Sequence, residues 1–217
     1  MTSIKLKQLE NAEDFLSQLE SIVLIAFRNI NQLCTVDKKF IESKMDDYQE
    51  VSYQLAFCIA ELEAVRAMVN YARKTSDEVS LTLDIALVFS AEKINLVWQR
   101  LFSHHLEIKL SRQKLLAFMS KKKVVVFFET YGKTVDLAKI GHKILETEDL
   151  QLPSGLEEDK DIIRSTFSRF TNTVVKPIAA NIHRKDTDIP SELVDAAAEL
   201  GCFGISIPEE FGGLILK

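Results

Sequence analysis

His104 and His105 are adjacent, and imidazole nitrogens are common ligands of zinc and other transition metals. A zinc site needs three or four ligands that point at one ion. Neighbouring residues of a helix, however, point about 100° apart, and no cysteine or carboxylate stands at a matching step around this pair. We therefore interpret the two histidines as part of a polar helix face or a helix junction, and the sequence predicts no metal site.

Lys121, Lys122 and Lys123 form a run of positive charge that could contact a phosphate group. Exposed lysines at a helix end are also favoured by the helix dipole, and we adopt this structural interpretation. The nearby sequence Tyr131–Thr134 contains Gly-Lys-Thr, but a phosphate-binding loop needs an earlier glycine where this chain has Phe127. Nucleotide binding through such a loop is therefore excluded.

Glu61, Glu63 and Arg66 follow one another within two turns of a predicted helix. Side chains three or four residues apart on a helix are neighbours, so we interpret these residues as solvated surface charge. No Gly-x-Ser-x-Gly sequence supports a nucleophilic serine. We assign no catalytic residue on these grounds.

The most specific pattern lies between residues 190 and 213. Pro190 suits the first turn of a helix, where its missing N–H would have had no partner. Gly201 suits the position just past a helix end, where the left-handed conformation is common. Gly212 and Gly213 permit a tight backbone path after Pro208. These residues predict a helix over about 191–200, followed by a short hydrophobic segment and a tight turn.

This order of residues resembles the N-terminal domain of flavin-dependent acyl-CoA dehydrogenases. In that family a helix closes on Leu-Gly, and the chain then reaches Pro-Glu-Glu, an aromatic residue and Gly-Gly, as it does here from Pro208 to Gly213. The resemblance covers about residues 155–217. One departure is Ile215, which follows Leu214 where the family usually has glycine. Further upstream, residues that fall where the family carries a helix leading into Val-x-Pro-x-Ala are Phe170, Val174, Pro177, Ala179 and Asp186.

The resemblance implies that Pro208, Phe211, Gly212 and Gly213 form a structural turn or part of the substrate-cavity wall. The complete enzymes use FAD to dehydrogenate an acyl-CoA thioester between its α and β carbons, and pass the electrons to an acceptor. Most flavin contacts and the glutamate base belong to later domains of the family. We therefore expect this chain to be the front part of such an enzyme, cut short, with no catalytic residue and no bound cofactor of its own.

A long helical region before the dehydrogenase segment is similar to the arrangement in methylsuccinyl-CoA dehydrogenases, which makes methylsuccinyl-CoA the candidate substrate. The alternative is a noncatalytic helical interaction or oligomerisation module, either a remnant or a subunit that acts in trans. A piece the size of residues 155–217 rarely buries enough apolar area to stand alone. We therefore expect a homo-oligomer or a missing C-terminal portion.

Composition limits the remaining classes of protein. Of the 217 residues, 47% are hydrophobic and 27% are charged, as in ordinary globular proteins. The net charge of -5 gives no positive field that would attract nucleic acid. Apolar runs such as 22–27 and 124–128 are far shorter than the roughly 20 residues of a membrane span. Three widely spaced cysteines, and the lack of a secretory signal, favour the cytoplasm.

The distribution of helix breakers divides the chain near residue 150. All four prolines and five of the seven glycines follow that point, and a sheet-rich domain before it would need more turn residues. We predict an all-α chain with three parts. They are an antiparallel bundle of four to six helices over residues 1–146, a linker over 147–156, and the first helices of an acyl-CoA dehydrogenase N-terminal domain over 157–217.

Local signals predict where individual helices begin. Asn11 and Asp37 are predicted N-caps of the first two helices, and the pattern allows a break near Asp46. The segments Thr75–Glu78 and Ser154–Glu157 have the spacing of capping boxes.

The helix that begins at Thr75–Glu78 is predicted to run past Trp98. The helix that begins at Ser154–Glu157 is predicted to run towards Pro177, where it kinks or ends. The segment Val124–Phe128 is rich in β-branched and aromatic residues, but its surroundings favour helix.

Overall fold

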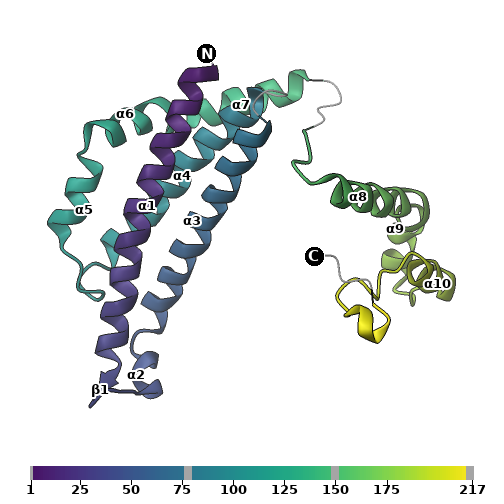
Figure 1. Cartoon of the computed structure of the whole chain (residues 1–217), viewed down its shortest axis with the longest axis horizontal. Coiled ribbons are helices and arrows are strands. Elements are labelled where there is room, and N and C mark those ends of the chain that lie inside the picture. The colour runs from purple at the N-terminus through teal and green to yellow at the C-terminus, as the bar shows by residue number, and fades with distance from the viewer. Residues whose placement is uncertain (1, 76–79, 148–151, 214–217) are drawn as a thin grey trace. The chain divides into compact units, whose positions relative to one another are not determined.

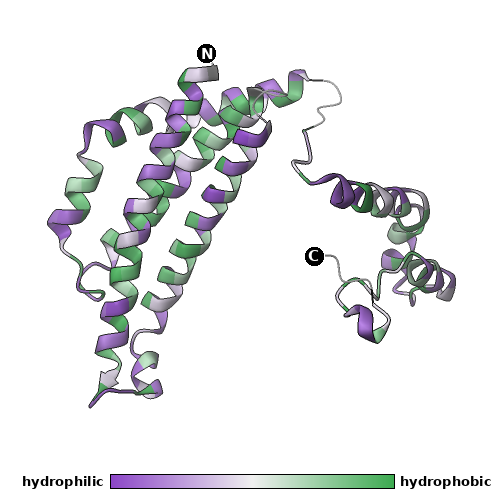
Figure 2. Cartoon of the chain, viewed as in Figure 1, coloured by the Kyte–Doolittle hydropathy of each residue, from purple (hydrophilic) through white to green (hydrophobic). Residues whose placement is uncertain are grey.

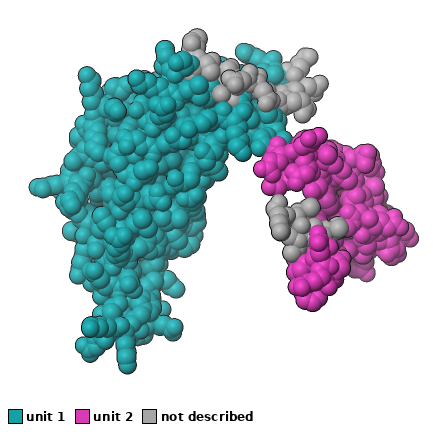
Figure 3. Space-filling view, viewed as in Figure 1, with its two compact units in different colours: residues 1–155 teal, residues 156–217 magenta. Residues whose placement is uncertain are grey.

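The computed structural model describes residues 2–75, 80–147 and 152–213. The chain divides into two compact units, residues 1–155 and residues 156–217 (Figures 1 and 3). Within the described ranges, the only sheet is one two-stranded hairpin, and the rest of the regular structure is helical. The predicted all-α fold is confirmed. No helix in these ranges combines the length and the apolar composition needed to cross a bilayer.

Three long helices form the centre of the first unit: α1 (Thr2–Leu33), α3 (Gln49–Thr75) and α4 (Ser80–Ser103). Each packs against the other two, and successive helices run in opposite directions (Figure 1). Hydrophobic and hydrophilic residues alternate along α1 and α3 in short steps, as expected for helices with one buried face (Figure 2). The buried residues of α1 are Leu9, Ala12, Phe15, Leu16, Leu19, Val23, Ala26 and Ile30.

The first two predicted N-caps are wrong. Asn11 lies inside α1, where its side-chain amide donates a hydrogen bond to Gln8 Oε1 at 3.0 Å. The helix begins earlier because Leu9 is already fully buried on the inward face. Asp37 lies in a hairpin between β1 (Thr35–Val36) and β2 (Lys39–Phe40), where Asp37 and Lys38 both have positive φ, 47° and 64°. Two such residues form the turn that suits a tight hairpin.

The allowed break near Asp46 is confirmed, because α2 (Glu42–Asp46) ends there and α3 begins at Gln49. The capping box predicted over residues 75–78 lies mostly outside the described residues. Thr75 itself is the last residue of α3, and its hydroxyl donates to the backbone oxygen of Tyr71 at 3.0 Å. As predicted, α4 continues past Trp98.

Three shorter helices complete the first unit: α5 (Arg112–Met119), α6 (Lys122–Tyr131) and α7 (Thr134–Glu146). The helical prediction for Val124–Phe128 is confirmed, since Val124 and Phe127 are buried on one face of α6. Phe15 makes edge-to-face contacts with Phe118 and Phe127, so α5 and α6 join the core of the bundle. The described part of this unit holds seven helices rather than four to six, because the break after Asp46 makes α2 a separate short helix.

The end of the first unit is fixed to α3 by Tyr71. The Tyr71 hydroxyl donates to the backbone oxygen of Pro153 at 2.5 Å. Gly155 has φ +66° and lies so close to the Tyr71 ring that an added Cβ would be 2.9 Å from it. Pro153 and Gly155 of the predicted linker therefore pack on α3.

The second unit contains α8 (Glu158–Phe170), the π-helix η1 (Thr171–Val175), α9 (Lys176–Lys185), α10 (Ser191–Glu199) and the 3₁₀ turn η2 (Glu209–Phe211). The predicted cap at Ser154 is wrong, because Gly155 is left-handed and α8 begins only after Glu157. Of the two outcomes predicted at Pro177, a kink or an end, the structure excludes the end. The helical path continues through η1 into α9, and the π segment just before Pro177 accommodates the missing N–H.

Candidate functional site

Helix α10 ends in a hydrogen-bonded C-terminal cap. Leu200 is the C-cap, and Gly201 follows with φ +81°. The Gly201 N–H donates to the Ala198 oxygen at 2.9 Å, and the Cys202 N–H donates to the Ala197 oxygen at 3.0 Å. These two bonds form the Schellman motif that a left-handed glycine permits. The predicted helix stop at Gly201 is therefore found, and it turns the chain into the segment that carries the candidate site.

The candidate turn is held by three backbone hydrogen bonds. Pro208 is the N-cap of η2, and its oxygen accepts from the N–H groups of Phe211 at 2.9 Å and Gly213 at 3.1 Å. Gly212 has φ +81°, and its N–H donates to the Glu209 oxygen at 2.9 Å. A Cβ added to Gly213 would lie 1.8 Å from the backbone oxygen of Ile207. Both glycines are therefore required by the backbone path, for two different reasons.

The structure brings the four predicted residues Pro208, Phe211, Gly212 and Gly213 into this one turn. The Phe211 ring is 75% exposed. The hydrogen bonds hold the backbone around Phe211, but the turn does not bury the side chain. No substrate or cofactor contact is assigned from this geometry, and the role in a cavity wall stays a prediction.

The second unit buries little of its apolar surface. None of its described residues, 156–213, is buried, although α9 and α10 are amphipathic helices with apolar residues on one side. Ile162, Ile189 and Phe203 are each more than 60% exposed. An amphipathic helix gains most of its stability by burying its apolar face, so this unit has apolar surface available for further packing.

The two histidines form separate contacts. His104 Nδ1 lies 2.7 Å from Glu107 Oε2, an acidic neighbour that the sequence interpretation missed, and His105 Nδ1 lies 2.7 Å from the backbone oxygen of Phe102. His105 also stacks on the Phe102 ring. Over the described ranges, no three metal-binding side chains come together in a group. The pair therefore belongs to the junction after α4.

The three lysines lie between two helices. Lys121 is the N-cap of α6, Lys122 and Lys123 begin that helix, and α5 ends at Met119. The cations thus follow the negative end of α5, but they also stand at the positive end of α6, which the helix dipole disfavours. Lys121 contacts Gln18 of α1, so part of this run links α6 to the bundle.

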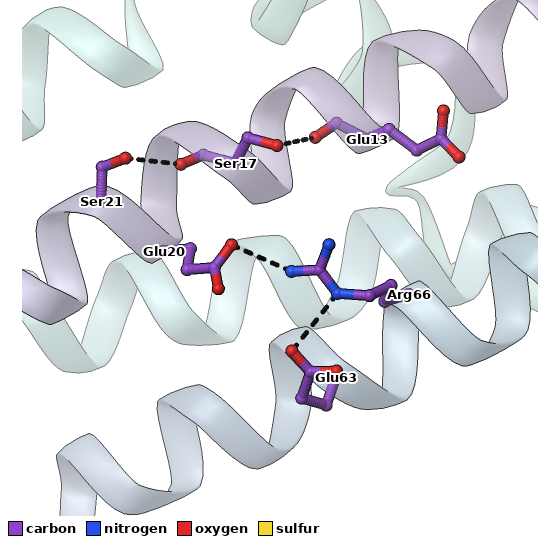
Figure 4. A network of polar contacts seen from close by, with 6 residues as sticks. All are labelled: Glu13, Ser17, Glu20, Ser21, Glu63 and Arg66. Carbon is purple, nitrogen blue, oxygen red and sulfur yellow. Dashed lines mark hydrogen bonds and ion pairs between the residues drawn. The ribbon is translucent and has the colours of Figure 1, made fainter.

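Arg66 bridges two helices at the surface. Its Nη2 lies 2.9 Å from Glu20 Oε2 on α1, and its Nε lies 3.3 Å from Glu63 Oε1 on α3 (Figure 4). All three side chains are at least one-third exposed, so the interpretation as solvated charge suits this group.

The interpretation of Glu61 as solvated is wrong. Only 14% of the Glu61 side chain is exposed, and its Oε1 pairs with Arg100 Nη2 of α4 at 3.2 Å. Arg100 also donates to Gln54 Oε1 at 2.5 Å and lies over the Phe57 ring. Glu61 faces α4 rather than solvent, which the sequence did not show because the partner lies 39 residues away.

The sequence analysis did not predict one further site. A cavity of about 370 Å³ lies between α4, α6 and α7, lined in part by Asp84, Val88, Tyr131 and Lys143. Asp84 Oδ2 lies 2.6 Å from Lys143 Nζ, and Asp84 Oδ1 lies 2.5 Å from Lys5 Nζ of α1. These residues come from four helices and form no local motif, so no sequence signal could have joined them.

Comparison with known proteins finds a match for the second unit. Residues 157–217 match the family model described as acyl-CoA dehydrogenase, N-terminal domain. Over these residues the chain is therefore similar to the acyl-CoA dehydrogenase family, as its sequence pattern indicated.

A (2S)-methylsuccinyl-CoA dehydrogenase of Cereibacter sphaeroides is 52% identical to the chain over 64 residues. The matched region covers 30% of this chain and 12% of that relative. The similarity thus concerns a small part of the relative.

Proposed function

We propose that residues 157–217 are the opening segment of an acyl-CoA dehydrogenase, with α,β-dehydrogenation of an acyl-CoA thioester as the activity of the complete enzyme. The observation that carries this proposal is the family match over residues 157–217. The name of the similar Cereibacter sphaeroides protein makes (2S)-methylsuccinyl-CoA the candidate substrate.

In this reaction a carboxylate takes the α-proton, and FAD, when bound, accepts a hydride from the β-carbon. We assign neither the carboxylate nor the flavin contacts to the residues of this chain. The part proposed for the turn over Pro208, Phe211, Gly212 and Gly213 is to shape one wall of the acyl-CoA cavity. The backbone hydrogen bonds of this turn, and the exposed Phe211 side chain, support such a role.

The exposed apolar surface of the second unit supports the proposal that this unit packs against a further domain or a second copy of the chain. None of residues 156–213 is buried, so the apolar faces of α8, α9 and α10 are available to a further domain or a second copy. We propose a cytoplasmic protein in which the dehydrogenase segment is active only together with the remaining dehydrogenase domains.

A second proposal is a noncatalytic helical module that acts through association. The well-packed core of the first unit supports it, because a bundle of this kind can serve as a stable platform for binding. Under this proposal the chain associates with itself or with a dehydrogenase subunit through the exposed side of α8–α10.

The two proposals are tested by mixing the purified chain with FAD and (2S)-methylsuccinyl-CoA. We expect the visible spectrum of free FAD and no bleaching when the thioester is added. A flavin that binds the chain and bleaches would instead show a complete reaction centre, and would contradict the proposal that the segment is active only together with the remaining dehydrogenase domains. Light scattering over a micromolar range tests the second, which predicts self-association; a monodisperse monomer would count against it.

A further inference from the structure

The helix α7 contributes nothing to the core of the first unit. No residue of α7 is buried, and none belongs to the hydrophobic cluster or to the half-buried residues that pack against it. The preceding helix α6 differs, because Val124 and Phe127 are buried in that cluster. At this end of the bundle α7 follows α6 and packs on α4 (Figure 1). It therefore lies over the bundle without being anchored by apolar side chains.

Two adjoining cavities lie beneath and beside α7. The larger, of about 370 Å³, borders Ile140 and Lys143, and the smaller, of about 260 Å³, borders Leu137. Val88 of α4 and Tyr131 of α6 line both cavities. Both cavities are partly open to solvent, so α7 lies along the groove between α4 and α6 without filling or sealing it.

A polar contact holds α7 in place instead. Asp84 of α4 accepts from Lys143 of α7 at 2.6 Å and from Lys5 of α1 at 2.5 Å. Burial opposes the charge of Asp84, but the hydrogen bonds and the charges of these two lysines outweigh burial and lower the pKa of its carboxyl. The other ion pair of α7, Lys139 with Asp136, lies within the helix and tethers it to nothing else.

The junction between α6 and α7 is short. The C-cap of α6 is Gly132 and the N-cap of α7 is Lys133, so two residues join the helices. A Cβ at Gly132 would lie 2.8 Å from the Phe128 oxygen, which requires glycine at this position. A few residues at the end of an element can absorb the dihedral changes of a hinge motion.

We propose that α7 is a hinged lid over the groove between α4 and α6, held shut by the latch Lys5–Asp84–Lys143. Opening separates Lys143 from Asp84 and uncovers Val88 and Tyr131. It leaves the core formed by α1, α3 and α4 intact, because α7 holds no core residue. Movement of the lid thus changes how widely the groove between α4 and α6 is open.

Hydrogen–deuterium exchange of the full chain, followed by mass spectrometry, tests the lid. We expect backbone amides of residues 134–146 to exchange through local opening, faster than those of residues 86–101 in α4. Lys143→Met removes the latch from a half-exposed position and should speed exchange of 134–146 by about three- to tenfold, with no change in α4. Lys143→Arg keeps a cation at this position and should restore slow exchange.

The matched control is Lys139→Met, which removes the ion pair within α7. Asp136, the partner of Lys139, is only 13% exposed, but the pair stays within one helix, so Lys139→Met should change exchange less than Lys143→Met does. The proposal is overturned if residues 134–146 exchange no faster than α4, or if Lys143→Met has no larger effect than Lys139→Met.

Discussion

The two glycines of the Pro208 turn are required for different reasons, and this difference can be measured. Gly212→Ala places a side chain at φ +81°, which costs about 1–2 kcal/mol of local stability. Gly213→Ala should lower the local stability of the turn further, because its Cβ would lie 1.8 Å from the backbone oxygen of Ile207. We expect exchange of residues 208–213 to be about tenfold faster in Gly212→Ala, and unprotected in Gly213→Ala.

Two controls separate backbone strain from a general effect of substitution. Gly212→Asn should be milder than Gly212→Ala, because asparagine tolerates the left-handed region. Gly141→Ala adds a Cβ that meets no atom within 4 Å, so it should leave the turn unchanged. Equal protection of the turn in wild type and Gly213→Ala would contradict this assignment.

Because of Cys58, the free energy of unfolding of the first unit should fall as the pH rises through the alkaline range. Burial raises the pKa of its thiol to about 12, and the nearby Arg100 only partly opposes this rise. In the unfolded chain the thiol ionises near pH 8.5. The folded form therefore binds the proton more tightly between these values, and this part of the stability is complete below about pH 8.5 and declines as the pH rises.

The pH prediction is measured by urea unfolding, with the fluorescence of Trp98, the only tryptophan of the chain, as the probe. Between pH 7 and about pH 10, wild type should lose about 1–2 kcal/mol more than Cys58→Ala. The variant has lost the thiol, so it controls for lysines and tyrosines that titrate in the same range. Identical pH slopes for the two proteins would refute the account.

At the scale of elements, the Arg100 ion pair contributes more to the contact between α3 and α4 than the surface pairs contribute elsewhere. Arg100→Met leaves the largely buried Glu61 carboxylate without its cation, which should lower the free energy of unfolding by about 1–3 kcal/mol. Arg66→Met breaks exposed pairs and should cost about 0–1 kcal/mol. Urea unfolding followed at Trp98 compares the two variants directly.

An equal cost for Arg66→Met and Arg100→Met would contradict this distinction. Arg100 also packs on Phe57 and bonds Gln54, so methionine is chosen because it keeps an unbranched apolar side chain in place of the arginine stem. A double variant with Glu61→Gln should recover part of the loss, because the buried group then carries no charge.

Helical periodicity in the sequence agrees with the buried faces of the long helices, but the local cap signals did not predict their ends. Phe15, Leu19 and Val23 recur at four-residue steps, which is the spacing of one helix face, and all three are buried in α1 because burial of a continuous stripe dominates helix stability. Asn11 has a favourable residue type for a cap, yet the buried Leu9 extends the helix past it. A cap contributes about 1 kcal/mol, so packing readily overrides it.

The turn after α10 was predictable because its signals are local. Gly201 and Gly212 adopt left-handed conformations that few other residues tolerate, and Pro208 sets the start of η2. The cavity at Asp84 could not be predicted in this way. Its residues come from helices far apart in the sequence, and only packing brings Lys5 and Lys143 to the same carboxylate.

On the scale of the whole molecule, the two units differ in how well they bury apolar surface. The first unit contains a continuous core that joins α1, α3, α4, α5 and α6, whereas the described part of the second contains no buried residue. We propose that the helical bundle over residues 1–146 and the dehydrogenase segment over 157–217 are separate domains. The hydrogen bond between Tyr71 and Pro153 fixes the chain to the helical bundle just before the second unit begins.

The central claim is that residues 157–217 serve as the opening segment of an acyl-CoA dehydrogenase. The most direct test replaces the matched 64-residue segment of the Cereibacter sphaeroides methylsuccinyl-CoA dehydrogenase with the corresponding segment of this chain. We expect a chimera that retains FAD and whose flavin bleaches when (2S)-methylsuccinyl-CoA is added. A folded, monodisperse chimera that lacks FAD or does not bleach, beside an unmodified relative that does both, would contradict the claim.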